Sequence, residues 1–214
     1  MKIGGIDENG RGSLIGPLVI TCFIIDENEI DRLKEIGVKD SKKLSKEKRE
    51  EIFEKLRNYE FYFELIFPKE IDIFLKNGNL NDLEAIYMAK LINRSDAKKY
   101  FIDSPSNPKK FQNKIRNYLK RDVELIVENK MDEKNLVVAA ASIIGKVIRD
   151  KEIEKIEKEV NEEIGSGYPG DKKTIEFLKN SLKNRKNYDF IRKSWVTYEK
   201  EKMKIRIKKI TDFI

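Results

Sequence analysis

Two short segments of the chain end in the same way, with an apolar run followed by an aspartate: Gly5-Ile6-Asp7 and Phe101-Ile102-Asp103. Glu8 follows the first aspartate directly, and Asp132 stands just before a long apolar segment. Because the carboxyl ends of neighbouring parallel strands meet at one edge of a sheet, we expect Asp7 and Asp103 to lie close together. The sequence therefore predicts a group of carboxylates at one edge of a sheet.

A group of carboxylates suits a particular chemistry in a chain without histidine. Carboxylates packed closely repel one another, and a bound divalent cation relieves this repulsion. The chain has no histidine and one cysteine, which excludes His-based catalytic pairs, His-ligated metals and Cys-based zinc sites. Oxygen ligands alone favour Mg²⁺ or Mn²⁺. Two such ions about 4 Å apart can activate a water and stabilise the leaving oxygen of a phosphodiester.

Each of these features also has a purely structural interpretation. Asp132 could be the N-cap of the helix that follows it, and Asp103 could begin an Asp-Ser-Pro turn. Gly10-Arg11-Gly12, which follows the first acid pair, could be an ordinary hairpin turn. Alternatively, its glycines let the backbone approach a phosphate or a sugar hydroxyl, and Arg11 adds a bidentate phosphate contact. The residues alone leave these alternatives open.

Hydrophobic periodicity predicts an α/β fold with a mixed five-stranded sheet flanked by helices. Val-rich, Ile-rich and aromatic runs predict strands, and amphipathic or apolar stretches predict helices. The expected strands are Lys2–Ile6, Leu14–Ile25, Phe61–Phe67, Lys99–Ile102 and Val123–Val127, and the expected helices are Ser45–Asn58, Asn81–Ile92, Pro108–Leu119 and Asn135–Val160.

Two of the predicted helices carry further signals. The helix from residue 81 has the outline of a capping box, with Asn81 followed by Glu84. The first half of the helix over 135–160 is apolar nearly all round, which is typical of a helix buried in the core. Gly145 lowers the helix propensity there and indicates a close packing contact.

The net charge of +7 is concentrated at one end of the chain. Residues 171–214 hold 14 Lys and Arg against 6 Asp and Glu, whereas residues 1–170 hold 31 against 32. A basic end suggests nucleic acid as the partner, although a solvated amphipathic helix would have the same composition. We expect a core domain over residues 1–168 and a basic, helical C-terminal subdomain over residues 169–214.

The sequence shows no sign of a membrane or secretory segment. No apolar run approaches the roughly 18 residues of a membrane span, and the N-terminus leads straight into a strand-like segment. Cys22 lies in an apolar run, as a small buried hydrophobe would. We expect a monomeric cytoplasmic protein that does not interact with membranes.

Several blocks of sequence together resemble the ribonuclease HII family. They occur in the family's order and span nearly the whole chain: GIDENGRG at 5–12, GPLV at 16–19, KDSKKLS at 39–45, FIDSPSNPKKF at 101–111, KMDEKNLVVAAASIIGKVIRD at 130–150, GSGYPGD at 165–171 and RKSW at 192–195. The family usually has alanine at Asn9 and proline at Ser13, and it commonly has histidine at Asn129 and alanine at Met131 or Gly145. None of these departures removes an expected metal ligand.

The resemblance implies a ribonuclease H-like fold and a set of site residues. It implies that Asp7, Glu8, Asp103 and Asp132 are the catalytic, metal-binding carboxylates. Tyr168 would stack on the sugar beside the scissile bond and help to detect the 2′-hydroxyl, the group that distinguishes RNA from DNA. The residues implied in substrate binding are Gly10, Arg11, Gly12, Ser41, Lys42, Lys43, Lys146, Arg149 and Tyr168.

Two of these substrate contacts have a structural alternative. Lys146 and Arg149 lie about one turn apart on the long helix and would hold phosphates of the strand. They could equally form ion pairs with Asp150 or Glu152. The basic C-terminal segment would cover the duplex without reading its sequence.

The implied activity is that of an endonuclease with two Mg²⁺ or Mn²⁺ ions. It would hydrolyse the RNA strand of RNA/DNA hybrids and cut on the 5′ side of ribonucleotides embedded in duplex DNA, a task in DNA repair and replication. The products would carry 3′-hydroxyl and 5′-phosphate ends. The apolar-aromatic tail Ile210–Ile214 could dock on a sliding clamp, or simply pack or fray.

Two other functions fit part of the sequence. A DNA resolvase or integrase-like nuclease would share the carboxylates but would not need Gly10-Arg11-Gly12 or Tyr168. A non-catalytic nucleic-acid binder would tolerate the loss of any acid, whereas all four acidic positions are filled here.

Overall fold

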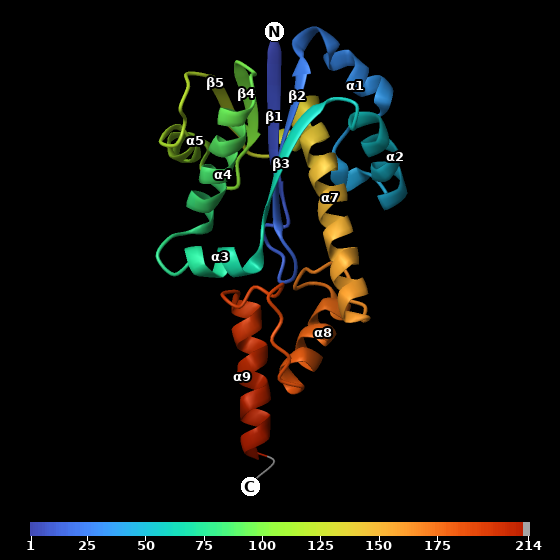
Figure 1. Cartoon of the computed structure of the whole chain (residues 1–214), viewed down its shortest axis with the longest axis vertical. Helices are drawn as coiled ribbons and strands as arrows, with labels where there is room; N and C mark the ends of the chain where they lie inside the picture. Colours follow the sequence, from blue (N-terminus) through green and yellow to red (C-terminus); the bar gives the residue numbers. More distant parts are fainter. Residues whose placement is uncertain (212–214) are drawn as a thin grey trace. The chain divides into compact units, whose positions relative to one another are not determined.

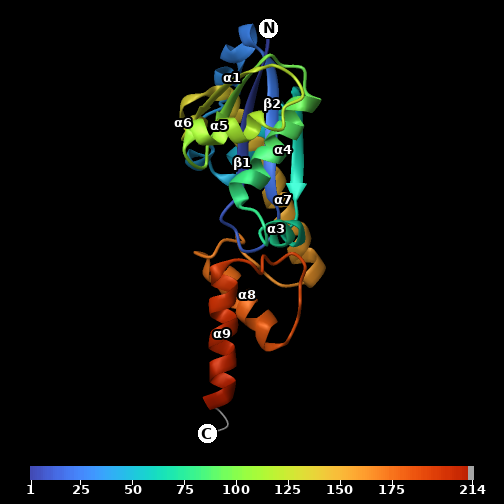
Figure 2. The ribbon, with the colours of Figure 1, turned by 90° about the vertical axis from the view of Figure 1, so that its left-hand side faces the viewer.

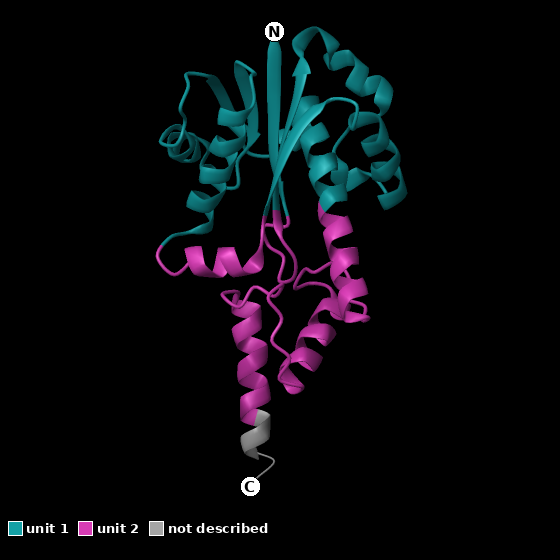
Figure 3. Ribbon diagram, in the orientation of Figure 1, with its two compact units in different colours: residues 1–9, 19–65, 78–148 teal, residues 10–18, 66–77, 149–214 magenta. Residues whose placement is uncertain are grey.

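The computed structural model describes the backbone of residues 1–211 and the side chains of residues 1–207. The chain forms two compact units whose segments alternate along the sequence (Figure 3). Unit 1 comprises Met1–Asn9, Val19–Leu65 and Gly78–Ile148, and unit 2 comprises Gly10–Leu18, Ile66–Asn77 and Arg149–Ile214. A functional division of the chain at residue 168 stays a prediction.

Unit 1 is built on a mixed five-stranded sheet with the strand order β3-β2-β1-β4-β5 (Figure 1). Strand β1 is antiparallel to β2 and parallel to β4, and β4 is parallel to β5. The predicted α/β fold class is thereby confirmed. The strands are β1 (Lys2–Asn9), β2 (Leu18–Asp26), β3 (Glu60–Ile66), β4 (Lys99–Asp103) and β5 (Glu124–Glu128).

Helices cover both faces of this sheet (Figures 1 and 2). One face packs against α1 (Ile30–Ile36), α2 (Lys46–Leu56) and the first half of α7 (Leu136–Val160), whose side chains share one core with β1 and β2. The predicted buried helix is confirmed, since Val137–Ala141, Ile143 and Ile144 are all buried. The other face carries α4 (Leu80–Arg94) and α5 (Pro108–Arg116).

Short helical turns complete unit 1. They are η1 (Glu27–Glu29), η2 (Ser41–Lys43) and α6 (Met131–Lys134). Asp40 caps η2, because its side chain accepts a hydrogen bond from Lys42 N. These turns matter for function, since η2 and α6 carry residues that the sequence nominates for the site.

Unit 2 has its own apolar core. It contains α3 (Pro68–Phe74), α8 (Lys172–Lys183), α9 (Val196–Thr211) and the second half of α7. Ile15 forms an isolated antiparallel bridge with Ile191. Tyr188 and Phe190 stack with ring centroids 4.6 Å apart. The buried core side chains are Leu14, Ile15, Ile153, Ile164, Phe177, Leu178 and Ile191.

Most helix and strand boundaries differ from the sequence prediction by one to three residues, and β1 runs to Asn9 instead of ending at Ile6. Strand β2 begins at Leu18 rather than Leu14, because the backbone of residues 14–16 hydrogen-bonds to Gly167 and Phe190 instead of to β1. The cap of α4 is Asn79, whose side chain accepts from Asp82 N, so the expected capping box at Asn81 is wrong. The helix expected to run to Leu119 ends at Arg116.

Asn135, not Asp132, caps the buried helix α7. Its side-chain oxygen accepts hydrogen bonds from Val137 N at 2.9 Å and Val138 N at 3.3 Å. The N-cap interpretation of Asp132 is therefore wrong, and this acid needs another explanation.

Further expectations concern membrane spans, the single cysteine and the C-terminal tail. Among the described residues, no helix combines the length and the apolar character needed to cross a bilayer. Cys22 is a buried free cysteine, as expected. The side chains of the tail Ile210–Ile214 lie outside the described residues.

Candidate active site

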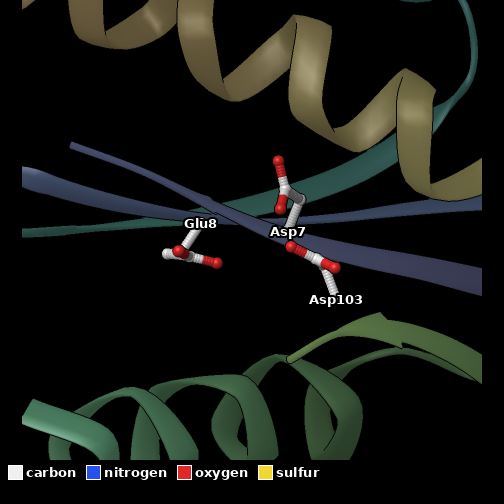
Figure 4. A group of neighbouring side chains, drawn as sticks. All are labelled: Asp7, Glu8 and Asp103. Atoms are coloured by element: carbon white, nitrogen blue, oxygen red, sulfur yellow. The ribbon is translucent and has the colours of Figure 1, made fainter. Parts of the chain in front are cut away.

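Three acidic side chains meet at the edge of the sheet in unit 1. Asp7, Glu8 and Asp103 each offer a carboxylate oxygen, and these oxygens lie within 4.8 Å of one another (Figure 4). The parallel register pairs Ile6 with Ile102, so the next residue of each strand reaches the same edge. The approach expected from the two strand ends is present in the structure.

Asp132 comes to this group from α6. It is buried, and its Oδ2 accepts a hydrogen bond from Lys42 Nζ at 3.0 Å. Its Oδ1 is also buried and has no hydrogen-bond partner among the described residues. Its charge raises the pKa of both Asp7 and Asp103. Asp132 therefore interacts electrostatically with Asp7 and Asp103, although it is not one of the three acids whose oxygens meet within 4.8 Å.

The raised pKa values of Asp7 and Asp103 show that their ionised forms are destabilised in the acid group. Burial, followed by the charges of Asp103 and Asp132, raises the pKa of Asp7 to about 8, against a hydrogen bond from Ser142 that lowers it. Burial is also the main cause that raises the pKa of Asp103. Negative charge is therefore unfavourable here unless a cation compensates it.

Neighbouring groups hold the carboxylates in place. Asp103 Oδ1 accepts a hydrogen bond from Met131 N at 2.7 Å, which fixes the strand-end acid to the start of α6. Ser142 Oγ, the partner of Asp7, lies 3.0 Å from Ser41 Oγ, and both serines are buried. Ser41 thus supports the acid group from within. Ser142 was missed in the sequence, although a polar residue inside an otherwise apolar helix is a signal.

The donor set fits a divalent metal ion. All the candidate ligand atoms are carboxylate oxygens, which Mg²⁺ and Mn²⁺ prefer. Asp132 Oδ1 is a buried, unmatched acceptor, and such an atom is explained by an ion that completes its coordination. The raised pKa of Asp7 is what a group of ligands shows before a cation offsets its charge.

Lysines lie beside Asp132. Lys42 and Lys43 lie on η2 with side chains that are 69% and 71% exposed, and they pair with Asp132 and Asp40 respectively. A pocket of about 250 Å³ next to Asp132 is lined in part by Lys39, Lys43 and Lys134. The sequence nominated Lys42 and Lys43 but missed Lys39 and Lys134, whose place depends on the folding of η2 and α6.

The Gly10-Arg11-Gly12 loop and Tyr168 belong to unit 2. Gly12 is exposed, and a β-carbon there would meet no atom within 4 Å. Tyr168 is half-buried, and its ring lies under the guanidinium of Arg149 with the cation 4.7 Å from the ring centroid.

Arg149 lies in the interior of unit 2 rather than at a phosphate-binding surface. Its side chain is fully buried and donates hydrogen bonds to Ser166 O at 3.1 Å and Ile15 O at 3.2 Å. A β-carbon at Gly10 would overlap this side chain. The structure therefore gives Arg149 a supporting role under the loop and Tyr168. Lys146, on the unit 1 half of α7, is half-buried, and its phosphate contact stays a prediction.

Comparison with known proteins agrees with this arrangement. A family model described as Ribonuclease HII matches residues 4–198. The chain belongs to the ribonuclease HII family. It is 46% identical to the Ribonuclease HII of Nanoarchaeum equitans, with all of both chains covered. It is 42% identical to that of Pyrococcus horikoshii, over 99% of this chain and 97% of the relative.

Solved structures show the same fold. The crystal structure of the ribonuclease H2 from Pyrococcus horikoshii OT3 matches with a TM-score of 0.88 and 42% identity, over 96% of this chain and 99% of that one. The PCNA:RNase HII complex from Archaeoglobus fulgidus matches with a TM-score of 0.85 and 34% identity, over 91% and 95%. The resemblance found in the sequence is confirmed, and the chain is a ribonuclease H, a phosphodiester hydrolase.

Proposed function

We propose that this ribonuclease HII cuts the RNA strand of RNA/DNA hybrids and cleaves on the 5′ side of ribonucleotides embedded in duplex DNA. The products carry 3′-hydroxyl and 5′-phosphate ends. The observation that supports the proposal is the meeting of Asp7, Glu8 and Asp103 within 4.8 Å, with Asp132 interacting electrostatically with Asp7, in a chain of this family.

The four carboxylates are proposed as ligands of two Mg²⁺ or Mn²⁺ ions. When bound at such a site, two ions supply an activated water and stabilise the leaving oxygen of the phosphodiester. The chain's own residues prepare the ligands: Ser142 holds Asp7, and Met131 N holds Asp103. Lys42 balances the negative charge of Asp132 while no cation is bound.

The substrate would be held through its phosphates and its sugar. Lys42 and Lys43 are proposed to bind phosphates, since both cations are exposed beside the acid group. Gly10-Arg11-Gly12 and Tyr168 are proposed to contact the ribonucleotide, because only a ribose offers a 2′-hydroxyl. A resolvase-type nuclease would gain nothing from such contacts, which favours the ribonuclease over that alternative.

The decisive experiment offers the protein a DNA duplex that contains one ribonucleotide, with Mg²⁺. We expect cleavage of this duplex and none of an all-deoxy control. Asp7→Asn should abolish cleavage, whereas Asp96→Asn should not, because Asp96 is an exposed acid that pairs with Lys2. Equal cleavage of both duplexes would favour the resolvase-type function, and full activity of Asp7→Asn would remove Asp7 from the site.

Clamp recruitment and cellular location stay predictions. The Archaeoglobus fulgidus relative was solved in complex with PCNA, and the tail Ile210–Ile214 is the candidate segment for such docking here. Deletion of residues 210–214 should abolish binding to an archaeal sliding clamp in surface plasmon resonance and leave cleavage of a short duplex unchanged. A cytoplasmic location can be tested by cell fractionation.

A further inference from the structure

The Gly10-Arg11-Gly12 loop is continued by a segment with fixed backbone partners in unit 2. Ile15 N donates a hydrogen bond to Gly167 O at 3.0 Å, and Gly16 N donates to Phe190 O at 2.9 Å. Residues 14–16 are therefore hydrogen-bonded to two other backbone segments, at Gly167 and at Phe190. The Gly10-Arg11-Gly12 loop directly precedes this hydrogen-bonded segment. The conformation of the loop depends on the partners of its carbonyl groups.

A buried arginine contacts those carbonyls. The side chain of Arg192 is fully buried. Its Nη1 donates to Arg11 O at 2.8 Å, and its Nε and Nη2 donate to Gly16 O at 3.3 and 3.1 Å. Its guanidinium lies 4.8 Å from the ring centroid of Trp195. One planar cation thus holds both ends of the segment from Arg11 to Gly16.

The direction of the Arg11 carbonyl also fixes the direction of the next amide. A trans peptide unit is planar, and its C=O and N–H point in opposite directions. All peptide bonds of the described chain are trans. Since Arg11 O points inward to Arg192, the N–H of Gly12 in the same peptide unit points away from this buried guanidinium. Gly12 is exposed, with open space where a β-carbon would be.

This orientation needs a partner to maintain it. A peptide unit that precedes glycine turns over easily, because glycine accepts both signs of φ. Turned over, the unit would bury the Gly12 N–H against a cation and present a carbonyl oxygen instead. Arg192 offers only donors, so it stabilises the orientation with the carbonyl inside and disfavours the other.

We propose that Arg192 is a positioning residue for ribonucleotide selection: it fixes the Arg11–Gly12 peptide so that the Gly12 amide is presented to the 2′-oxygen of the substrate. This inference rests on the proposed function, in which the loop contacts the ribonucleotide. Arg192 does not touch the substrate itself. It acts through the direction of one peptide unit.

The test separates recognition of the 2′-hydroxyl from binding of the duplex. For each variant, kcat and KM are measured on a duplex with one ribonucleotide in Mg²⁺, and an all-deoxy duplex serves as competitive inhibitor. We expect Arg192→Gln to lower kcat/KM by about threefold to tenfold, the effect of one neutral hydrogen bond, with the Ki of the all-deoxy duplex unchanged. Arg192→Lys keeps a cationic donor and should recover part of the activity.

Controls distinguish positioning from general damage. Arg121 also donates to backbone carbonyls, those of Ser95 and Ala97 in unit 1, so Arg121→Gln is the matched variant and should leave the ratio of kcat/KM to 1/Ki, which compares catalysis with affinity for the all-deoxy duplex, unchanged. Thermal denaturation checks folding, and if Arg192→Gln does not fold, Arg192→Lys carries the comparison. The proposal is overturned if that ratio is unchanged in the folded variants, or if kcat/KM and affinity for the all-deoxy duplex fall together. A wild-type enzyme that cuts both duplexes equally would instead reject the proposed function.

Discussion

Asp7 is held in the acid group at an electrostatic cost. Its pKa is raised from an ordinary value near 4 to about 8. An acid whose pKa is higher in the folded state binds its proton more tightly there. The protonated Asp7 therefore contributes to the free energy of unfolding fully below pH 4, and this contribution is lost as the pH rises from 4 to 8. The metal-free protein should therefore lose stability across this interval.

We expect Asp7→Asn to remove this pH dependence. Without metal, the variant should melt several degrees above the wild type at pH 8 and close to it at pH 4, because the asparagine carries no charge. Added Mg²⁺ should raise the melting temperature of the wild type at pH 8 and have less effect on the variant. Calorimetry in EDTA and in Mg²⁺ measures both effects. A variant that melts below the wild type at pH 8 would contradict the electrostatic account.

Asn9 lies directly against Gly145 of the buried helix α7. A β-carbon at residue 145 would overlap Asn9 Oδ1 and come within 2.7 Å of Thr21 Oγ1. Both oxygens are buried and have no hydrogen-bond partner within the described part of the chain. The close contact predicted for Gly145 is thus present. The side chain of Asn9 fills the space that a β-carbon at residue 145 would need, and both residues depart from the family pattern.

A double-mutant cycle tests this coupling. Gly145→Ala alone should destabilise the protein by about 1–3 kcal/mol, the range for overpacking a core. In the Asn9→Ala background the same change should cost clearly less, since only the contact with Thr21 Oγ1 then remains and alanine favours the helix by about 1 kcal/mol. Urea denaturation of the four proteins gives the coupling energy. Additive effects would mean that the two residues do not share this space.

The sequence predicted most of the sheet and part of the site. The strands and the buried helix were visible because hydrophobic periodicity reports burial directly. The meeting of Asp7 and Asp103 was predicted from two segments that end alike in sequence, although β1 continues past Asp7 to Asn9. The positions of Lys39, Lys134 and Ser142 could not be predicted, because they depend on how η2, α6 and α7 pack in three dimensions.

Arg149 shows the same limit. Its basic side chain on a helix fits a phosphate contact as well as an internal one, and only the fold shows that Gly10, Ser166 and Tyr168 surround it. The cap of α4 was misassigned for a different reason. Asn79 and Asn81 are both acceptable N-caps, and a shift of two residues leaves the apolar pattern of the helix almost unchanged.

The cap assignment leads to a prediction about α4. Asn79→Ala should lower the free energy of unfolding by about 1 kcal/mol, because the variant has no side-chain acceptor for the Asp82 N–H. Asn79→Ser should retain most of the stability, since serine caps helices well. Urea denaturation measures both variants. An unchanged stability of Asn79→Ala would show that the cap contributes nothing to it.

The excess of positive charge in residues 171–214 has two interpretations, a duplex-binding surface or a solvated face. Many of its cations already pair with acids, such as Lys186 with Glu162 and Lys204 with Glu201. Lys183 and Arg185, at the end of α8, are exposed. They are the sharper probes, because a phosphate contact there would not compete with an ion pair within the described residues.

Replacement of Lys183 and Arg185 by glutamine separates the two interpretations. If both reach phosphates, the slope of log Kd against log salt should fall by about 0.9 for each phosphate that the variant no longer binds. Affinity should weaken alike for ribonucleotide-containing and all-deoxy duplexes, because phosphate contacts carry no sugar information. Fluorescence anisotropy over a series of salt concentrations, in buffer without metal, measures both quantities.

The matched control is Lys34→Gln, which removes an exposed cation of α1 that pairs with Asp31. An unchanged slope in the double variant would assign Lys183 and Arg185 to a solvated face. A lower slope in the control would mean that the total charge of the protein, and not the C-terminal surface, controls binding.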